Sequence, residues 1–315
     1  MENVIVSVKN LSKSFGEMRA VKGLSFHIHR GEFFGLLGPN GAGKTTTIGM
    51  LTGLIDPSCG RIVIDGVDLL ARPKQAKAKI GFVPQDFAFY PTLSARDNLV
   101  FFGGIYGLHG RRLRQRTEAV LHMVELQDRS AQVVSTFSNG MKRRLNIAIG
   151  LLHEPHILIL DEPTVGVDAH RRQVILEDLN NFNRDGLTVL YTTHRMDEAQ
   201  RLCHRVAIMD RGKMIAMDTP SALIGDSGES IIRVRFSDAI PQTRMDQLAQ
   251  LGPLKILDTK RTSFHLKTKD PDKVIKEVLA LSEEAKIRIK SLDVLEPSLE
   301  TVFLHLTGRS LNTAG

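Results

Sequence analysis

The chain has 315 residues, 42% hydrophobic and 24% charged, which is the composition of a globular protein with one large core, or with one large and one small domain. The longest strongly apolar stretch, "NLVFFGGIYGL" (98–108), is too short to cross a bilayer, and "MENVIVSVKN" (1–10) lacks the apolar core of a signal peptide. The net charge of +7 is compatible with nucleic acid, anionic lipid or anionic ligands, or with solubility alone. Cys59 and Cys203 have neither metal-type spacing nor a disulfide framework, so we expect a cytoplasmic protein.

Strand-like runs alternate with helical patterns up to about residue 223, which predicts an α/β architecture with a central sheet. Four short apolar runs end in glycine or in a polar residue: "EFFGLLG" (32–38), "KIGFVPQ" (79–85), "HILILDE" (156–162) and "LTVLYTTH" (187–194). In open α/β sheets, ligands bind at the carboxyl ends of the strands. We therefore expect a glycine-rich loop, a glutamine, two acids and a histidine to gather at one site.

The pattern between residues 86 and 155 is mainly helical and predicts a helical subdomain inserted between strands. The arginines of "RRLRQR" (111–116) form either a solvated helix face or a contact with lipid headgroups. In "STFSNGMKRRL" (135–145), Ser138 is the expected N-cap of a helix. Three cations follow at 142–144, where the helix dipole disfavours positive charge, so this helix start either tolerates a penalty or accepts an anion.

The last third of the chain begins with a hairpin predicted in "RVAIMDRGKMIAMD" (205–218), a short helix in "TPSALI" (219–224) and a linker in "GDSGES" (225–230). Beyond the linker we expect strands and helices in the order β-α-β-β-α-β, which is that of a ferredoxin-like unit. These elements are expected at 231–236, 244–251, two strands turning near 259–262, 271–285 and 287–293, followed by a helix at 298–308. The predicted domains are therefore 1–224 and 225–315.

The segment "GPNGAGKTT" (38–46) matches the pattern G-x-x-x-x-G-K-[ST] between a strand and a helix. In such a loop the glycines turn backbone N–H groups toward phosphates, the lysine reaches the terminal phosphates and the following hydroxyl ligates Mg²⁺. A coincidental glycine-rich turn would not need the strand–loop–helix context. The expected nucleotide-binding residues are Gly38, Pro39, Asn40, Gly41, Ala42, Gly43, Lys44, Thr45 and Thr46, with Thr45 also a Mg²⁺ ligand.

Four further residues at strand ends carry the expected chemistry of phosphate hydrolysis. Asp161 is expected to hold Mg²⁺, directly or through water, and Glu162 to orient and deprotonate an attacking water. Gln85 could contact Mg²⁺ or that water, and His194 could hold the terminal phosphate. Taken singly such residues are usually structural, but their place beside the phosphate loop favours these roles.

The ordered set "GPNGAGKTT", "VPQ", "FSNGM", "ILILDEPTVGVD" and "TTH" resembles an ATP-binding cassette (ABC) ATPase over roughly residues 1–220. The resemblance implies a P-loop NTPase core in which Phe15 stacks on adenine and Asp168 lies in a loop between two nucleotide sites. It also implies a head-to-tail dimer, in which Ser138 and Gly140 face the ATP held by Lys44 of a second copy. The signature reads Phe-Ser-Asn-Gly-Met, where the common family form is Leu-Ser-Gly-Gly-Gln.

The ending "EPSLETVFLHLTGR" (296–309) is similar to ATPases of the daunorubicin-resistance and nodulation-export type. That resemblance implies a subunit held at the inner face of the cell membrane by a separate permease that exports a drug, a lipid or a lipid-linked saccharide. It also implies a docking groove for the permease, which we expect to be lined by Phe87, Phe89 and Tyr90. The C-terminal segment could instead be a plain stability module.

The alternative function is a soluble ABC ATPase that acts on ribosomes or DNA and uses the positive charge. One cassette and the absence of sustained heptads in the sequence argue against that class, so we expect no nucleic-acid partner. An importer ATPase is disfavoured by the C-terminal ending, and a simple P-loop kinase by the signature and the Asp161-Glu162 pair.

Overall fold

The computed structural model describes residues 3–225, 230–258 and 261–307, and the chain divides into two compact units, Met1–Met217 and Asp218–Gly315. The division falls slightly before the domain boundary expected after residue 224. Helix α8 (Pro220–Ile224) lies on the far side of the division because it packs against α11 (Leu299–Thr307) of the second unit. Residues 226–229 of the predicted linker lie outside the described residues.

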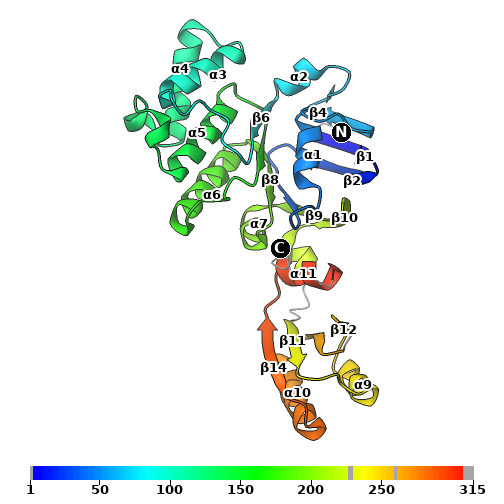
Figure 1. Cartoon of the computed structure of the whole chain (residues 1–315). Helices are drawn as coiled ribbons and strands as arrows, with labels where there is room; N and C mark the ends of the chain where they lie inside the picture. The colour runs from blue at the N-terminus through cyan, green and yellow to red at the C-terminus, as the bar shows by residue number, and fades with distance from the viewer. Residues whose placement is uncertain (1–2, 226–229, 259–260, 308–315) are drawn as a thin grey trace. The chain divides into compact units, whose positions relative to one another are not determined.

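The first unit is built on a six-stranded sheet in the order β10-β9-β3-β8-β7-β6 (Figure 1). Its strands are β3 (Phe33–Leu37), β6 (Ile80–Val83), β7 (Ile157–Asp161), β8 (Thr188–Thr193), β9 (Arg205–Asp210) and β10 (Lys213–Asp218). The four predicted runs are confirmed as β3, β6, β7 and β8, which pair in parallel. Every residue of β3, β7 and β8 is buried, which explains the absence of charged residues in β3 and β8 and the uninterrupted apolar run of β7 before Asp161.

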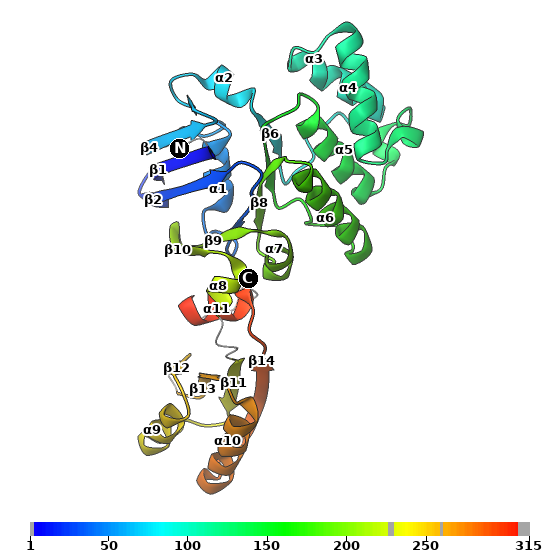
Figure 2. The ribbon, with the colours of Figure 1, turned by 180° about the vertical axis from the view of Figure 1, so that it is seen from behind.

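A second, antiparallel sheet precedes and flanks the phosphate loop and was not predicted from the sequence. It has the order β2-β1-β4-β5, from β1 (Val4–Phe15), β2 (Met18–His29), β4 (Cys59–Ile64) and β5 (Val67–Asp68). The stacked rings of Phe26 and Phe34, 5.6 Å apart, belong to the core that both sheets share. Figure 2 shows α1 (Lys44–Leu51) between the two sheets, and α1 contacts both β2 and β7.

Asp65, in the turn between β4 and β5, ties segments that are far apart in the sequence. Its carboxylate accepts hydrogen bonds from Lys79, from Arg30 and from the His156 ring, whose Nδ1 lies 2.8 Å away. Burial acts to raise the pKa of Asp65, but these hydrogen bonds outweigh burial and lower that pKa to about 2. The antiparallel sheet is thereby joined to the ends of two segments that lead into the central sheet.

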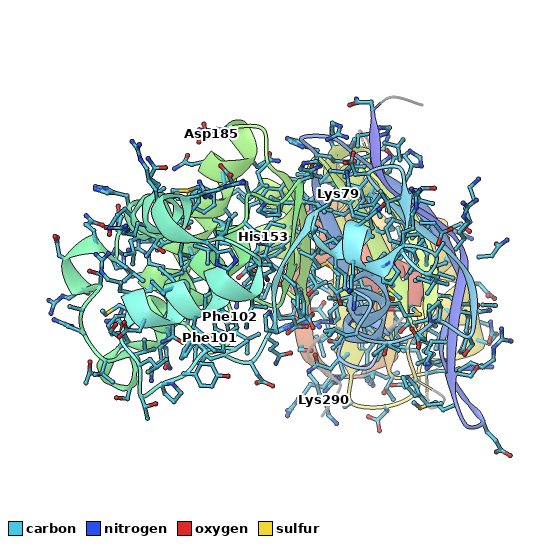
Figure 3. The ribbon with its side chains drawn as sticks, turned by 90° about the horizontal axis from the view of Figure 1, so that it is seen from above. Lys79, Phe101, Phe102, His153, Asp185 and Lys290 are labelled. Carbon is cyan, nitrogen blue, oxygen red and sulfur yellow. The ribbon has the colours of Figure 1, made fainter. Side chains whose placement is uncertain are left out.

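The predicted helical subdomain contains α3 (Ala95–Ile105), α4 (Gly110–Met123) and α5 (Asn139–Leu151), which pack against one another. The shorter α2 (Pro73–Lys77) precedes it, and α6 (Ala169–Arg184) and α7 (Met196–Leu202) follow it in the sequence. Helix α5 also packs on β6. His153, labelled in Figure 3, donates from Nε2 to the Ile80 carbonyl at 3.0 Å and stacks on Tyr106 at 3.9 Å. The subdomain is therefore anchored to the edge strand of the sheet.

The second unit contains the predicted ferredoxin-like domain. Its elements are β11 (Ser230–Phe236), α9 (Gln242–Gln250), β12 (Leu254–Ile256), β13 (Ser263–Thr268), α10 (Pro271–Ala285) and β14 (Ile289–Leu295). The strand order β12-β13-β11-β14 is antiparallel throughout, and a core that includes Phe236 and Phe264 lies between the sheet and both helices. Over the ranges that the structure describes, no helix is long and apolar enough to cross a membrane.

His265 on β13 is a buried base inside this domain. Neither of its ring nitrogens has a hydrogen-bond partner among the described residues. Burial lowers the pKa of His265 to about 4, and the positive charges of Arg233 on β11, Lys255 on β12 and His305 on α11 act in the same direction. The folded domain therefore holds this ring neutral.

We predict that the ferredoxin-like domain loses stability in mild acid. The unfolded chain binds a proton at His265 near its usual pKa of 6.5, which the folded domain binds only near 4. The free energy of unfolding should be constant above pH 6.5 and should fall by about 3 kcal/mol as the pH drops to 4. Hydrogen exchange of the β11 and β13 amides, corrected for intrinsic rates, measures this change. His265→Leu should remove the slope, and an equal slope in both proteins would contradict the prediction.

Candidate functional site

The loop between β3 and α1 has a backbone that only glycine accommodates at two positions. Gly38 and Gly43 have φ values of 154° and 102°. A Cβ on Gly38 would lie 2.4 Å from the Met209 carbonyl oxygen, and one on Gly43 would lie 2.7 Å from that of Ala20. The loop curls around the Lys44 ammonium, which donates to the Gly38 carbonyl at 2.8 Å and to the Pro39 carbonyl at 3.2 Å. The fold thus builds a close-fitting cradle around a cation.

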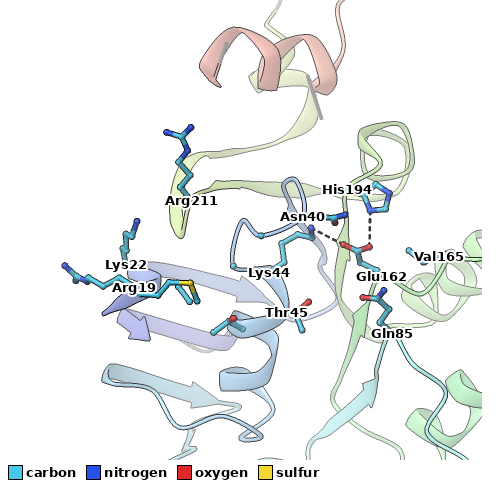
Figure 4. Close-up of a pocket in the computed structure, with 15 residues that line it drawn as sticks. Arg19, Lys22, Asn40, Lys44, Thr45, Gln85, Glu162, Val165, His194 and Arg211 are labelled. Carbon is cyan, nitrogen blue, oxygen red and sulfur yellow. Dashed lines mark hydrogen bonds and ion pairs between the residues drawn. The ribbon is translucent and has the colours of Figure 1, made fainter. Parts of the chain in front are cut away.

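A cavity of about 690 Å³ opens beside this loop (Figure 4). It brings together Asn40, Gly41, Gly43, Lys44, Thr45, Thr46, Gln85, Glu162 and His194 from the predicted site. It also includes Arg19 and Lys22 of β2 and Arg211 of the hairpin between β9 and β10. With Lys44, the lining therefore has four cations and one acid, which suits a polyphosphate anion.

Glu162 is the centre of the site's ionic contacts. One carboxylate oxygen lies 3.0 Å from Lys44 Nζ and the other lies 3.0 Å from His194 Nδ1, as the dashed lines in Figure 4 mark. Glu162 has a left-handed backbone with φ of 46°, and its N–H donates to Thr192 Oγ1 at 2.9 Å. That backbone, which costs energy for a residue other than glycine, turns the side chain into the cavity.

Asp161 lies behind Glu162 and does not line the cavity. It is 3% exposed, and its Oδ1 accepts a hydrogen bond from Thr192 Oγ1 at 2.7 Å. The two neighbouring carboxylates therefore have different environments. Thr45 and Gln85 do line the cavity, so hydroxyl and amide oxygens face the space where Mg²⁺ is expected.

The signature segment forms a second, separate cavity of about 230 Å³. Ser138 caps α5 as predicted, because its side-chain oxygen accepts a hydrogen bond from the Met141 N–H at 3.3 Å. Gly140 lies against Arg171, whose Cδ would be 2.8 Å from a Cβ on that glycine. Asp168 caps α6 by accepting from the Arg171 N–H at 3.0 Å, and this contact helps to lower the pKa of Asp168. The two cavities share no lining residue.

Two of the three cations at the start of α5 have partners within the chain that the sequence did not predict. Arg143 is 2% exposed and donates to the carbonyls of Pro84 at 3.1 Å and Gln85 at 2.9 Å. Its guanidinium also lies 4.9 Å from the Phe87 ring centroid. Arg144 pairs with Glu125 at 2.9 Å and Asp178 at 3.5 Å. Hence an anion at the helix start is not needed to account for these two charges.

Phe15, expected to stack on adenine, is not among the residues that line the larger cavity. It ends β1 half-exposed, with Lys13 Nζ 5.1 Å from its ring centroid. Met18 and Arg19, just across the turn on β2, do line the cavity. No sequence motif pointed to them, because their place depends on the unpredicted antiparallel sheet.

Residues 21–165 match the family model described as "ABC transporter". The linearmycin resistance ATP-binding protein of Bacillus subtilis (strain 168) is 41% identical over 98% of this chain and 99% of its own length. The chain is an ATP-binding subunit of the ABC transporter family. It is thus an ATPase, and the phosphate loop, Glu162 and the signature belong to one catalytic cassette.

Further similar proteins extend this assignment to both units of the chain. The Nod factor export ATP-binding protein I of Paraburkholderia xenovorans (strain LB400) is 38% identical over 99% of each chain. The daunorubicin resistance ATP-binding protein of Streptomyces coeruleorubidus is 34% identical over 98% of this chain and 97% of its own. The family type predicted from the C-terminal ending is therefore confirmed.

Solved structures match the cassette part of the chain. A cassette described as dimeric, in a post-hydrolysis state and bound to ADP and phosphate, has a TM-score of 0.61 and 29% identity over 68% of this chain and 98% of that one. A Clostridium perfringens subunit described as part of an ABC transporter complex has a TM-score of 0.64 and 29% identity over 69% of this chain and 89% of that one. The predicted P-loop ABC ATPase fold is confirmed.

We predict that Arg143→Met destabilises the first unit. The substitution leaves the Pro84 and Gln85 carbonyls without their guanidinium donors, so the free energy of unfolding should fall by about 2 kcal/mol or more. Lys142→Met makes the same change of charge one residue away, on a side chain that is only half-buried, and should cost under about 0.5 kcal/mol. Urea unfolding followed by circular dichroism measures both, and equal losses would contradict the role of Arg143.

Proposed function

We propose that this ATPase hydrolyses ATP at a site shared between two copies of the chain and so drives a separate membrane permease that exports its cargo. The observation that carries the proposal is the division of the expected chemistry between two cavities. One holds Lys44, Glu162 and His194, and the other holds Ser138 and Gly140. A head-to-tail pair of chains would bring each cavity against the other kind. A solved structure of a similar cassette is described as dimeric with ADP and phosphate bound, which supports this arrangement.

The larger cavity fits the triphosphate of ATP. Lys44 would exchange the Gly38 and Pro39 carbonyls for terminal phosphate oxygens, while Arg19, Lys22 and Arg211 add positive charge nearby. In this proposal the Phe15 ring stacks on adenine. Met18 and Arg19 of the same hairpin line the cavity between the adenine and the phosphates.

The oxygen-rich side chains near the loop fit a Mg²⁺ ion bound together with ATP. The Thr45 hydroxyl and the Gln85 amide face the cavity, and Asp161 would act through a water because it does not line the cavity itself. When bound, the ion would neutralise phosphate charge in the transition state. The chain's own contribution is to hold Thr45 in the first turn of α1, Gln85 just after β6 and Asp161 at the end of β7.

Glu162 and His194 would act on the attacking water. Glu162 already contacts Lys44 and His194, so a phosphate that draws Lys44 away would leave a carboxylate that keeps only its hydrogen bond with the His194 ring. That carboxylate would accept a proton from water, while His194 orients both the water and the terminal phosphate. Asp168, at the start of α6, would face the nucleotide site of the partner chain and so couple the two sites.

The names of the similar proteins support export as the direction of transport. They are called linearmycin resistance, Nod factor export and daunorubicin resistance ATP-binding proteins. We propose a cargo of the same broad kind, a drug, a lipid or a lipid-linked saccharide. The permease would hold this subunit at the inner face of the cell membrane. Within the subunit, we propose an ABC domain at 1–224 and an accessory domain at 225–315.

The permease would dock on the aromatic segment that precedes α3. Phe87 and Phe89 stack at 5.3 Å, and Tyr90 packs on Phe101 of α3 at 5.0 Å. Phe87, Tyr90 and Phe101 remain exposed although they are large and apolar (Phe101 is labelled in Figure 3). Because the Arg143 guanidinium lies against the Phe87 ring, a helix bound here would contact a ring that packs on a residue of the signature helix.

We predict that Glu162→Gln binds ATP but hydrolyses it at least about 100-fold more slowly, because the amide cannot take a proton from water. With ATP retained, the variant should accumulate as a dimer that the unmodified protein forms only transiently. Light scattering after gel filtration with ATP and Mg²⁺ measures the dimer, and phosphate release measures hydrolysis. Glu177→Gln, on the exposed face of α6, is the matched control. An unchanged rate of hydrolysis in Glu162→Gln would remove Glu162 from the role of base.

We predict that Ser138→Arg abolishes hydrolysis while the isolated chain still binds a fluorescent ATP analogue, because only the half-site for the partner's ATP is blocked. Ser135→Arg, an exposed change nearby, should keep activity. Lys44→Ala should also be inactive, because it loses the lysine that binds the ATP phosphates while its own signature segment stays intact. Mixing the Ser138→Arg and Lys44→Ala chains should restore hydrolysis, since each mixed dimer then contains one intact site. If the mixture stays inactive while both chains remain folded, the shared-site model fails.

A further inference from the structure

Glu198 on α7 is a buried carboxylate with no role so far. Its side chain is 2% exposed. It accepts hydrogen bonds from three hydroxyl groups: Tyr191 at 2.5 Å, Thr164 at 3.1 Å and Thr193 at 3.3 Å. Because burial and the neighbouring carboxylate raise the pKa of Tyr191 well above its usual value, that phenol remains a donor.

Two arginines complete the surroundings of this carboxylate. Arg195 Nε lies 3.1 Å from Glu198 Oε1, and Arg172 Nε lies 3.7 Å from the same oxygen. Arg172 also donates to the Val167 carbonyl at 3.2 Å. A carboxylate removed from water is stable only when it is paired and hydrogen-bonded. Glu198 has hydrogen bonds from the three hydroxyls and ion pairs with the two arginines, whose Nε atoms make no hydrogen bond among the described residues.

Two of these partners, Thr164 and Arg195, lie in the loops that follow Glu162 and His194, whereas Tyr191 and Thr193 lie on β8 and Arg172 lies on α6. Thr164 and Val167 belong to the segment that joins Glu162 to Asp168. Thr193, the last residue of β8, and Arg195, the N-cap of α7, flank His194. Hence the Glu198 carboxylate links the segment after Glu162, through Thr164, to both neighbours of His194, whose ring lies 3.0 Å from Glu162.

We infer that Glu198 is a positioning residue for ATP hydrolysis, which sets the distance between the loop of Glu162 and Asp168 and the loop of His194. The inference rests on the proposed function, since it assumes that Glu162 acts on water. Thr192 makes a parallel cross-link, because it binds both Asp161 and the Glu162 N–H. The Thr192 link joins the ends of β7 and β8, while Glu198 joins the end of β8 and the start of α7 to the segment that follows Glu162.

This role separates hydrolysis from ATP binding. None of the groups around Glu198 belongs to the phosphate loop or lines the larger cavity. Loss of the carboxylate should therefore shift Glu162, His194 and Asp168 while leaving the Lys44 cradle intact. A purely structural carboxylate would instead affect folding, ATP affinity and turnover together.

The test compares Glu198→Gln and Tyr191→Phe with Glu177→Gln, the exposed control on α6. Glutamine keeps the shape of the side chain but points N–H groups at hydroxyl and guanidinium donors, whereas phenylalanine removes one hydrogen bond and leaves the charge. We expect kcat to fall about 10- to 100-fold in Glu198→Gln and less in Tyr191→Phe, as for other displacements of catalytic groups. The KM for ATP, and the affinity for a fluorescent ATP analogue, should stay within about twofold of the unmodified protein.

Melting temperatures recorded beside the kinetics keep the outcomes distinct. A folded Glu198→Gln or Tyr191→Phe whose kcat is unchanged overturns the inference, and so does a variant in which kcat and ATP affinity fall together. If Glu198→Gln does not fold, Tyr191→Phe decides alone. Should Glu162→Gln hydrolyse ATP at the full rate, the proposed function itself fails, whatever the Glu198 variants do.

Discussion

The parallel pairing of β3, β8 and β7 is the constraint on which the catalytic cassette depends. Leu37 pairs with Thr193, and Asp161 pairs with Thr192, so three strands end at the same level. Because parallel strands point the same way, everything that follows them in the sequence is delivered to one edge of the sheet. The phosphate loop, Glu162 and His194 meet there although about 150 residues separate the first from the last.

Charged side chains around that edge are of two kinds: cations that line the open cavity, and buried charges that have partners within the chain. The open cavity concentrates four positive side chains where an anion would bind. Behind it, buried charges are paired within the chain, as Arg143 is with two carbonyls and Glu198 with three hydroxyls. The segment of Gln85 and the segment after Glu162 are therefore joined to the rest of the cassette by buried polar contacts.

Motifs whose function depends on adjacent residues could be predicted well. The phosphate loop, the acid pair and the Ser138 cap each depend on neighbours in the sequence, and the structure has the predicted local geometry at each. The antiparallel sheet was missed because it depends on the pairing of β1 with β2 and with β4, and β4 follows the phosphate loop in the sequence. Arg19, Lys22 and Met18 were missed for the same reason.

By itself, the sequence determined which chemical groups this protein has and the order in which they follow the strands, and that order was enough for the family and the fold. Only the tertiary structure decided which groups meet. In the structure, buried Arg143 donates to the Gln85 carbonyl, and Thr164 and Arg195 from two loops contact Glu198. The contacts of Arg143 with Gln85 and of Glu198 with Thr164 join residues tens of positions apart, so no local pattern of hydrophobicity or charge encodes them.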